Sequence, residues 1–149
     1  MLLSKACTYG LRAALHLATL PPGKRVPIRA LGDALGVPYP FLAKVVQTLV
    51  HAGLLSTARG PSGGVRLARP AGDVRLREVV EAVDGEDPFS ACALGLPGCG
   101  DRDPCPLHRA WVEARSRLEG VLDGTTLGDL SARLAAGELR LSDVEGGRG

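Results

Sequence analysis

Apolar residues recur every three or four positions in several short segments of this chain, and proline and glycine turns separate the segments. Residues 4–20 form the first segment, and a Pro-Pro-Gly turn follows it. Residues 26–35 and 39–52 form two more, joined by a tight turn at 36–38. The spacing predicts three helices, the last of which ends at Gly53. Two short helices joined by a glycine-containing turn are typical of a helix-turn-helix, which presents its second helix to the DNA major groove.

Two short β-prone segments, 54–59 and 65–69, follow these helices and flank a Gly-Pro-Ser-Gly-Gly turn. A hairpin directly after a helix-turn-helix predicts the wing of a winged-helix domain. Arg59 then lies near the tip of the wing, where it can enter a narrow minor groove with enhanced negative potential. The alternative is a plain hairpin with a solvated arginine.

The second half of the chain predicts three more helices, at 76–83, at 107–122 and at 126–136, where Thr126 and Asp129 resemble a capping box. The helix over 107–122 carries an apolar seam with the spacing of a helix that packs against a partner helix, although the seam can also dock on its own domain. The seam comprises Leu107, Trp111, Ala114, Leu118, Val121 and Leu122. The tail from residue 142 is expected to be frayed.

The predicted fold is mainly α with a small β wing, a winged helix-turn-helix DNA-binding domain plus a long dimerisation helix. Its expected organisation is a DNA-binding domain with an N-terminal helix at 1–85, a cysteine-rich loop at 86–106, the dimerisation and C-terminal helices at 107–141, and a flexible tail at 142–149.

The composition predicts an aliphatic core, because the 149 residues include only 2 Phe, 2 Tyr and 1 Trp. Arg12 and His16 interrupt the first apolar run, and no run reaches the roughly 18 residues that cross a bilayer. We therefore expect a cytoplasmic protein with no signal peptide and no membrane partner. No nucleophile–base pair or phosphate-binding loop is visible, so neither an enzyme nor a small-molecule substrate is expected.

Charge divides the chain into a basic and an acidic half. Residues 1–77 hold 11 Lys or Arg and 2 Asp, a net charge of +9, whereas residues 78–149 hold 7 Arg and 14 acids, a net charge of −7. A concentrated positive charge on one half of the chain indicates polyanion binding, with double-stranded DNA the first candidate. The alternative is chance clustering on a solvated surface. The residues expected at the DNA are Lys5, Arg25, Tyr39, Pro40, Lys44, Gln47, Arg59, Ser62, Gly63 and Arg66.

These DNA-binding candidates have different expected roles. Tyr39, Lys44 and Gln47 are placed to reach bases or phosphates from the second helix of the helix-turn-helix. Lys5, Arg25 and Arg66 would mostly attract phosphates regardless of sequence, which predicts binding that weakens strongly with salt.

Candidate metal chemistry lies in a loop rich in Gly, Pro and Asp, where Cys92, Cys99, Cys105 and His108 are separated by six, five and two residues. Structural zinc sites usually pair cysteines two to four residues apart, so the wider gaps favour an iron–sulfur cluster. Zinc and reducible thiols remain alternatives, and disulfides are disfavoured without a secretion signal. Cys7 is expected to be a small buried residue; reaching a cluster across a dimer is its less favoured role.

Several motifs together resemble the winged-helix iron–sulfur transcriptional regulators of the IscR and NsrR type. They are Tyr9-Gly-Leu-Arg, Arg59-Gly-Pro-Ser-Gly-Gly-Val, Glu81-Ala-Val-Asp-Gly, the three cysteines, His108-Arg-Ala-Trp and Thr126-Leu-Gly-Asp-Leu. The likeness is closest to the IscR branch, because a histidine three residues after the last cysteine leads into a Trp-bearing helix. In the nitric-oxide branch an acid near the N-terminus completes the cluster, whereas Thr8 stands at about that place here.

The resemblance implies a homodimer with one 2Fe-2S cluster per subunit on Cys92, Cys99, Cys105 and His108, with 4Fe-4S as the alternative. It implies that the cluster controls operator binding in response to iron–sulfur supply, redox stress or nitric oxide. A zinc- or thiol-based redox repressor is the alternative function, followed by an iron–sulfur electron carrier. The chain departs from the family in a first cysteine gap of six residues instead of five, and in Pro38 and Pro40 at the recognition helix.

Overall fold

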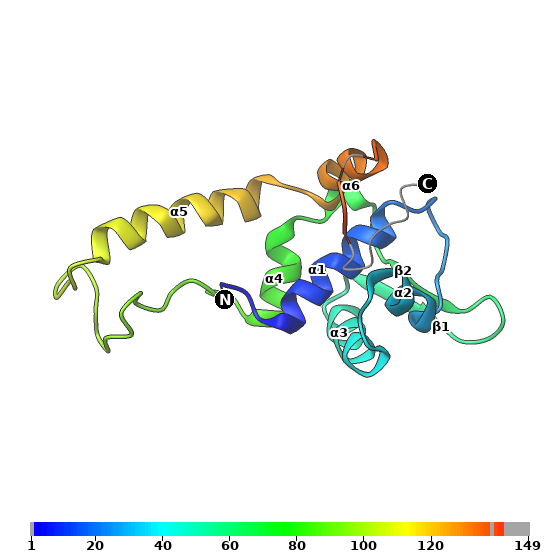
Figure 1. The fold of residues 1–149 in the computed structure, drawn as a ribbon, viewed down its shortest axis with the longest axis horizontal. Helices are drawn as coiled ribbons and strands as arrows, with labels where there is room; N and C mark the ends of the chain where they lie inside the picture. The colour runs from blue at the N-terminus through cyan, green and yellow to red at the C-terminus, as the bar shows by residue number, and fades with distance from the viewer. Residues whose placement is uncertain (1, 138, 142–149) are drawn as a thin grey trace.

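The computed structural model describes residues 2–137 and 139–141, which form a head and a long arm (Figure 1). Its elements are α1 (Lys5–Ala18), α2 (Ile28–Leu35), α3 (Tyr39–His51), β1 (Leu55–Ala58), β2 (Gly64–Leu67), the 3-10 helix η1 (Ala71–Asp73), α4 (Leu76–Asp84), α5 (His108–Gly124) and α6 (Leu127–Ala135). The predicted mainly helical fold with a two-stranded antiparallel wing is confirmed. The sequence pattern did not predict η1, and the tail predicted from residue 142 lies outside the described residues.

The core of the head is aliphatic and is organised around α1, which contacts α3, α4 and α6. Cys7 has 0% of its surface exposed, which confirms its predicted burial. Gly10 lets α1 approach α3 closely, because a Cβ at this position would lie 3.1 Å from Cγ1 of Val45. Each fully buried Leu or Val contributes about 1.5–3 kcal/mol, so burial of the apolar faces of these short helices stabilises the head.

Helices α2 and α3 form the predicted helix-turn-helix. Gly36 adopts a left-handed conformation with φ 70° and ends α2, and the N–H of Val37 donates to the carbonyl oxygen of Gly32 over 2.9 Å. Pro40 lies in the first turn of α3, where its fixed φ suits a helix and its missing N–H costs no helical hydrogen bond. The turn therefore buries the inner face of α3 and leaves its outer face in solvent.

The wing is tied to the start of the helix-turn-helix. Leu55 pairs with Leu67, and Ala58 pairs with Gly64 across the hairpin. A backbone bridge joins Val26 to Val65 through hydrogen bonds of 3.0 and 2.8 Å. The position of the wing is thus coupled to the segment that enters α2.

The arm consists of α5 and the loop of residues 86–107 that leads to it from α4 (Figure 1). The structure divides the predicted seam of this helix. Leu122 is buried and Leu118 packs with it against the core of the head, and Arg77 of α4 forms an ion pair with Asp123. Val121 is 57% exposed and Leu107 is 45% exposed, so another strip of the seam faces solvent. Within the predicted seam, this exposed strip is the part that is free to meet a partner helix.

Helix α6 returns to the head and packs against α1 and η1. The predicted capping box is present, because the hydroxyl of Thr126 accepts from the N–H of Asp129 and the Asp129 carboxylate accepts from the N–H of Thr126. Leu127 is fully buried, and its N–H donates to Val74. The domain boundaries at residues 85, 106 and 141 stay predictions. None of the described helices combines the length and the apolar character needed to cross a membrane.

Candidate metal centre and DNA interface

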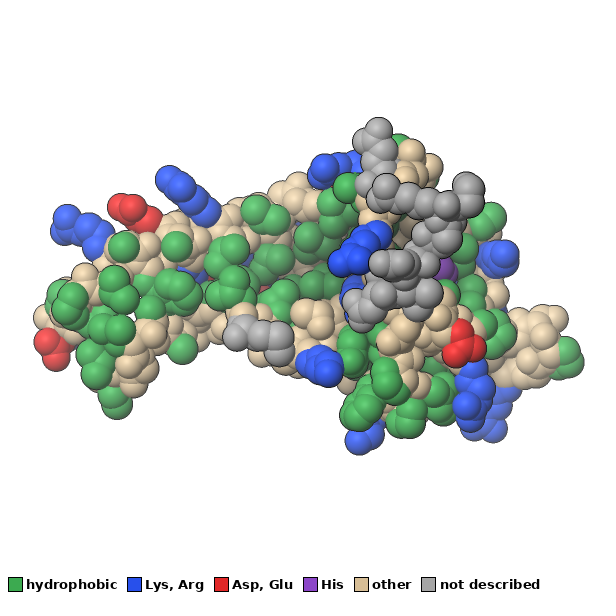
Figure 2. Space-filling view, in the orientation of Figure 1, with side chains coloured by type: hydrophobic (Ala, Val, Ile, Leu, Met, Phe, Trp, Pro, Cys, Tyr) green, Lys and Arg blue, Asp and Glu red, His purple; other side chains and the backbone are tan. Residues whose placement is uncertain are grey.

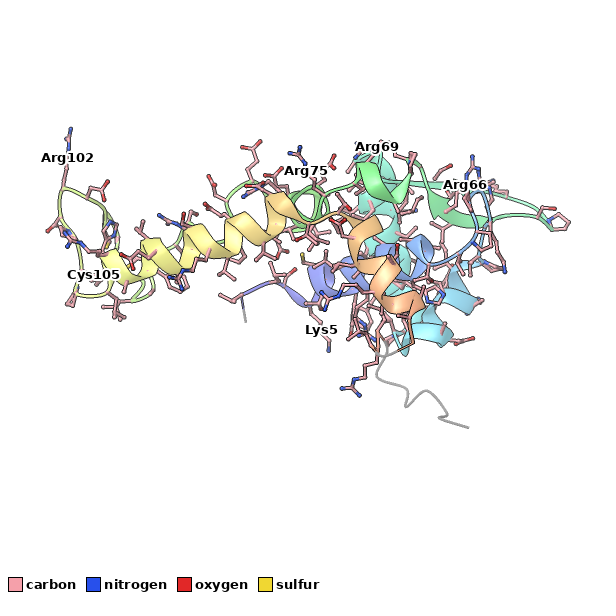
Figure 3. The ribbon with its side chains drawn as sticks, turned by 90° about the horizontal axis from the view of Figure 1, so that it is seen from above. Lys5, Arg66, Arg69, Arg75, Arg102 and Cys105 are labelled. Carbon is pink, nitrogen blue, oxygen red and sulfur yellow. The ribbon has the colours of Figure 1, made fainter. Side chains whose placement is uncertain are left out.

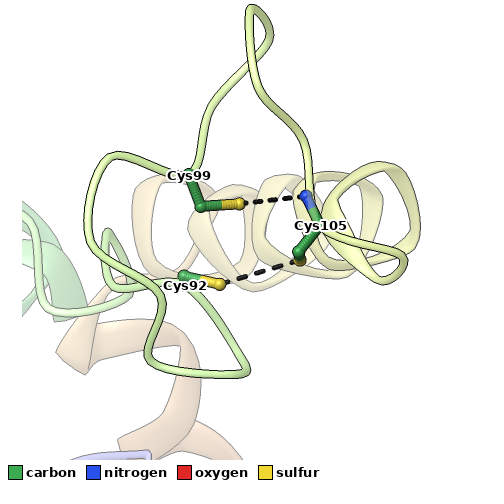
Figure 4. A group of neighbouring side chains, drawn as sticks. All are labelled: Cys92, Cys99 and Cys105. Carbon is green, nitrogen blue, oxygen red and sulfur yellow. Dashed lines mark hydrogen bonds between the residues drawn. The ribbon is translucent and has the colours of Figure 1, made fainter.

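The cysteine loop brings three thiols together at the end of the arm that lies away from the head (Figures 3 and 4). The sulfur atoms of Cys92, Cys99 and Cys105 all lie within 4.8 Å of one another. Sγ of Cys92 is 3.7 Å from Sγ of Cys105, and the backbone N–H of Cys105 points to Sγ of Cys99 over 3.4 Å. Residues separated by up to 13 positions therefore share one small volume.

Glycine turns and one tryptophan hold this loop in shape. Gly95 and Gly98 have φ values of 72° and 73°, which L side chains rarely adopt. The N–H of Gly95 donates to the carbonyl oxygen of Cys92 over 2.9 Å and closes the first turn. The indole Nε1–H of Trp111 donates to the carbonyl oxygen of Ala91 over 2.9 Å, so the first turn of α5 anchors the start of the loop.

His108 lies at the first residue of α5, beside the three cysteines. Its Nδ1 is 3.6 Å from Sγ of Cys99, and its Nε2 is 3.0 Å from Oδ1 of Asp101. The structure thus brings all four predicted ligands to one end of the arm. Asp101 was not predicted as part of the site, and no spacing rule singles it out among the acids of the loop.

The thiols of the loop differ from the thiol in the core. Hydrogen bonds from the backbone N–H groups of Leu96 and Leu94 lower the pKa of Cys92 to about 7. Burial, together with the nearby carboxylate of Asp84, raises the pKa of Cys7 to about 12. Cys7 lies inside the head at 0% exposure, apart from the cysteine loop. The thiols that can serve as metal ligands are therefore those of the loop.

The donor set fits a metal centre. A zinc–sulfur distance of about 2.3 Å places two thiolates of a tetrahedral ion roughly 3.8 Å apart, close to the 3.7 Å between Cys92 and Cys105. Soft thiolates with one imidazole suit zinc or iron–sulfur clusters and suit magnesium or calcium poorly. The three cysteines can therefore hold a metal, with His108 adjacent to them.

The outer face of α3 presents most of the predicted DNA-reading side chains to solvent. Tyr39, Pro40, Lys44 and Gln47 are all exposed. In the wing, Arg59 and Ser62 are exposed and Gly63 is half-buried, so the tip is accessible as well.

Three predicted phosphate contacts differ in their surroundings. Arg25 is half-buried, and its guanidinium donates to the carbonyl oxygens of Ser56 and Gly64 over 3.2 and 3.3 Å. It therefore braces the wing. Arg66 is half-buried on β2 of the wing, whereas Lys5 is exposed at the first residue of α1 (Figure 3). The structure does not bring Lys5 together with the wing arginines.

Two exposed residues at the helix-turn-helix were not predicted from the sequence to contribute to the site. The guanidinium of Arg29 lies 4.1 Å from the ring centroid of Tyr39, and Phe41 is 59% exposed in the first turn of α3. Helical spacing places Phe41 off the buried stripe of Leu42, Val45 and Val46, so its exposure was predictable from the sequence. The contact between Arg29 and Tyr39 could not be predicted from the sequence, because it depends on the angle between α2 and α3.

Comparison with known proteins identifies the family. Residues 3–133 match the profile of Rrf2, described as an iron-dependent transcriptional regulator. The chain belongs to the Rrf2 family. It is similar to the HTH-type transcriptional regulator IscR of Citrobacter koseri and to that of Salmonella newport, each 33% identical over 130 residues, which cover 87% of this chain and 79% of the relative.

Solved structures support the fold. CymR, the global cysteine regulator of B. subtilis, superposes with a TM-score of 0.75 at 24% identity, over 88% of this chain and 96% of that one. T. potens IscR superposes with a TM-score of 0.73 at 23% identity, over 93% and 91%. The chain is accordingly an Rrf2-type transcriptional regulator, which acts by binding DNA and is not an enzyme.

Proposed function

We propose that this Rrf2 regulator carries an iron–sulfur cluster, 2Fe-2S, on Cys92, Cys99, Cys105 and His108, and that the cluster controls operator binding. The observation that carries a metal at this site is the convergence of three thiols within 4.8 Å in a loop with little apolar core of its own. The family description as iron-dependent and the similarity to IscR support iron as the metal. When bound, the cluster supplies a redox-active and labile group.

The exposed strip of α5 supports a homodimer. Leu107, Ala114 and Val121 of the seam are exposed and follow one another at intervals of seven residues, and Ala110, which is outside the seam, is exposed between the first two. Figure 2 shows hydrophobic side chains gathered along this arm. Two such arms packed against each other would remove these side chains from water. We propose that the two arms run antiparallel, so that each cysteine loop, at the far end of its arm, lies close to the head of the partner subunit.

In the proposed complex each α3 enters a major groove and each wing enters an adjacent minor groove, with half-sites about one turn, ~34 Å, apart. Lys44 and Gln47 reach base edges or phosphates, and Arg59 enters the minor groove. The double variant Lys44→Ala with Arg59→Ala should lose most operator affinity. Unchanged affinity would rule out this docking.

Control by the cluster requires a different operator affinity with and without it. Ordering of residues 92–108 around a metal changes how the arm meets the partner's head, and a coupling of about 1–3 kcal/mol is typical of such linkage. That coupling corresponds to a 5- to 150-fold change in affinity. The physiological signal is proposed to be iron–sulfur supply or oxidative or nitric oxide stress.

Anaerobic purification followed by iron and acid-labile sulfide analysis and an absorption spectrum tests the cluster. We expect iron and sulfide in equal amounts and a red-brown protein whose operator affinity changes when the cluster is removed. A protein that cannot be loaded with iron and sulfide would contradict the proposal. Equal operator affinity of the two forms would contradict the sensing role.

A zinc-based regulator on the same scaffold is the second candidate, and the mutual closeness of the thiols favours it. Three sulfur atoms within 4.8 Å match the ligand spacing around one ion, whereas a cluster spreads its ligands over two or more irons. A colourless protein that contains one zinc per chain and no sulfide would identify this form.

A further inference from the structure

The hydrogen bond between Asp101 and His108 determines which ring nitrogen faces the cysteines. A carboxylate can only accept hydrogen bonds, so the 3.0 Å contact from Oδ1 of Asp101 requires a hydrogen on Nε2 of His108. In the neutral ring, Nδ1 then carries the lone pair, and it lies 3.6 Å from Sγ of Cys99. We propose that Asp101 is a positioning residue that holds His108 in this tautomer and orientation. The proposal rests on the metal centre proposed above and adds a residue to it.

The backbone of the loop prepares this contact. The N–H of His108 donates to the carbonyl oxygen of Cys105 over 3.0 Å, so the start of α5 is fixed relative to the last cysteine. The N–H of Asp103 donates to Gly100 over 3.2 Å and closes a turn that carries Asp101 toward the ring. The His108 side chain is only 19% exposed, which limits the orientations that the ring can take.

Asp101 itself is 100% exposed, so its bond to His108 contributes little to folding stability. Its effect lies in selecting one state of the ring. A rotation of the ring by half a turn would direct a C–H toward the thiols, and the other tautomer would direct an N–H toward them. Neither group can bind a metal. Histidine ligands in metal sites almost always donate their second N–H to a carboxylate or carbonyl, which also makes the bound nitrogen a stronger donor.

Asp103 offers a matched control. It is an exposed acid in the same turn, and within the described parts of the chain its carboxylate makes no hydrogen bond or ion pair. Asp103→Ala therefore removes the same charge from the loop without touching His108. Asp101→Asn keeps an oxygen acceptor and removes the charge, whereas Asp101→Ala removes both.

The first measurement uses the full, reduced, metal-free chain and nitrogen NMR of its histidines. We expect His108 to carry its hydrogen on Nε2 in the unaltered chain, in Asp101→Asn and in Asp103→Ala, and to show mixed tautomers in Asp101→Ala. Identical His108 nitrogen shifts in Asp101→Ala and the unaltered chain would overturn the proposal. This readout needs no cluster, so it separates the proposal from the identity of the metal.

The second measurement is a Co²⁺ titration of the same four proteins, followed by absorption. Loss of a partner of this kind weakens metal binding by about 10- to 100-fold, so we expect that loss for Asp101→Ala and none for Asp103→Ala. In a His108→Cys background, Asp101→Ala should have no further effect. An effect that persists in that background would assign Asp101 a merely structural role. If the unaltered chain bound neither Co²⁺ nor iron, the proposed metal centre itself would be refuted.

Discussion

The guanidinium of Arg29 stacks over the ring of Tyr39 at 4.1 Å from the centroid, which joins the first helix of the helix-turn-helix to the first turn of the second. Both residues are exposed, and Tyr39 retains 39% of its surface. A cation–π contact at an exposed site contributes about 0.5–1 kcal/mol. The contact keeps a positive charge beside the entry of α3, where a DNA phosphate would approach.

Arg29→Ala should therefore weaken operator binding with little loss of stability. The loss of one phosphate contact makes the negative slope of log affinity against log salt less steep by about 1. Fluorescence anisotropy at several salt concentrations measures that slope, and thermal unfolding measures stability. Arg133→Ala, on α6 at the opposite side of the head from α3 in Figure 1, is the charge-matched control. An equal loss of affinity in both variants would show a general charge effect.

Val121→Glu should convert the proposed homodimer to a monomer, because it places a charge in the exposed apolar strip of α5. Sedimentation equilibrium measures the mass of the particle. Ser116→Glu adds the same charge to an exposed position on another face of the helix and should stay dimeric. If Val121→Glu remained dimeric, the partner would contact a different surface.

Gly64→Ala should destabilise the wing and the head together by about 2–3 kcal/mol. Gly64 has φ +127°, and a Cβ there would lie 2.4 Å from the carbonyl oxygen of Val26, within the bridge that ties the wing to the entry of α2. Chemical denaturation measures the free energy of unfolding. Gly72→Ala is the control, because a Cβ at Gly72 meets nothing within 4 Å. A stability equal to that of the unaltered chain would contradict the close approach.

Cys7 should resist alkylation in the folded, metal-free protein at pH 8. Its thiol is fully buried and has a pKa of about 12, so the reactive thiolate is scarce at that pH. We expect iodoacetamide to modify three of the four free cysteines before unfolding and all four after it, as mass spectrometry can count. Rapid modification of Cys7 in the folded chain would indicate that α1 opens readily.

The sequence pattern predicted the elements well because their signals are local. Apolar residues at helical spacing, the turn at Gly36 and the capping box at Thr126 each act over a few residues, and all three are present in the structure. The burial of Cys7 was predictable for the same reason, since it lies on the apolar stripe of α1.

The three cysteines and His108 could be selected as ligands from residue type and spacing, yet their arrangement depends on the whole loop. Sequence order places the loop between the head and α5. In the structure the thiols lie at the far end of the arm, because the loop must run the length of α5 before that helix returns (Figures 1 and 3). The same path of the loop places Asp101 beside His108.

The sequence by itself determined which segments are helices, where the wing turns and which side chains can bind a metal, because hydrophobic period, turn chemistry and donor type are properties of neighbouring residues. Only the tertiary structure decided that Leu122 faces the head while Val121 faces solvent, that Arg25 braces the wing, and that Asp101 meets His108. These relationships depend on the angles and distances between elements, which arise when many weak contacts are satisfied together.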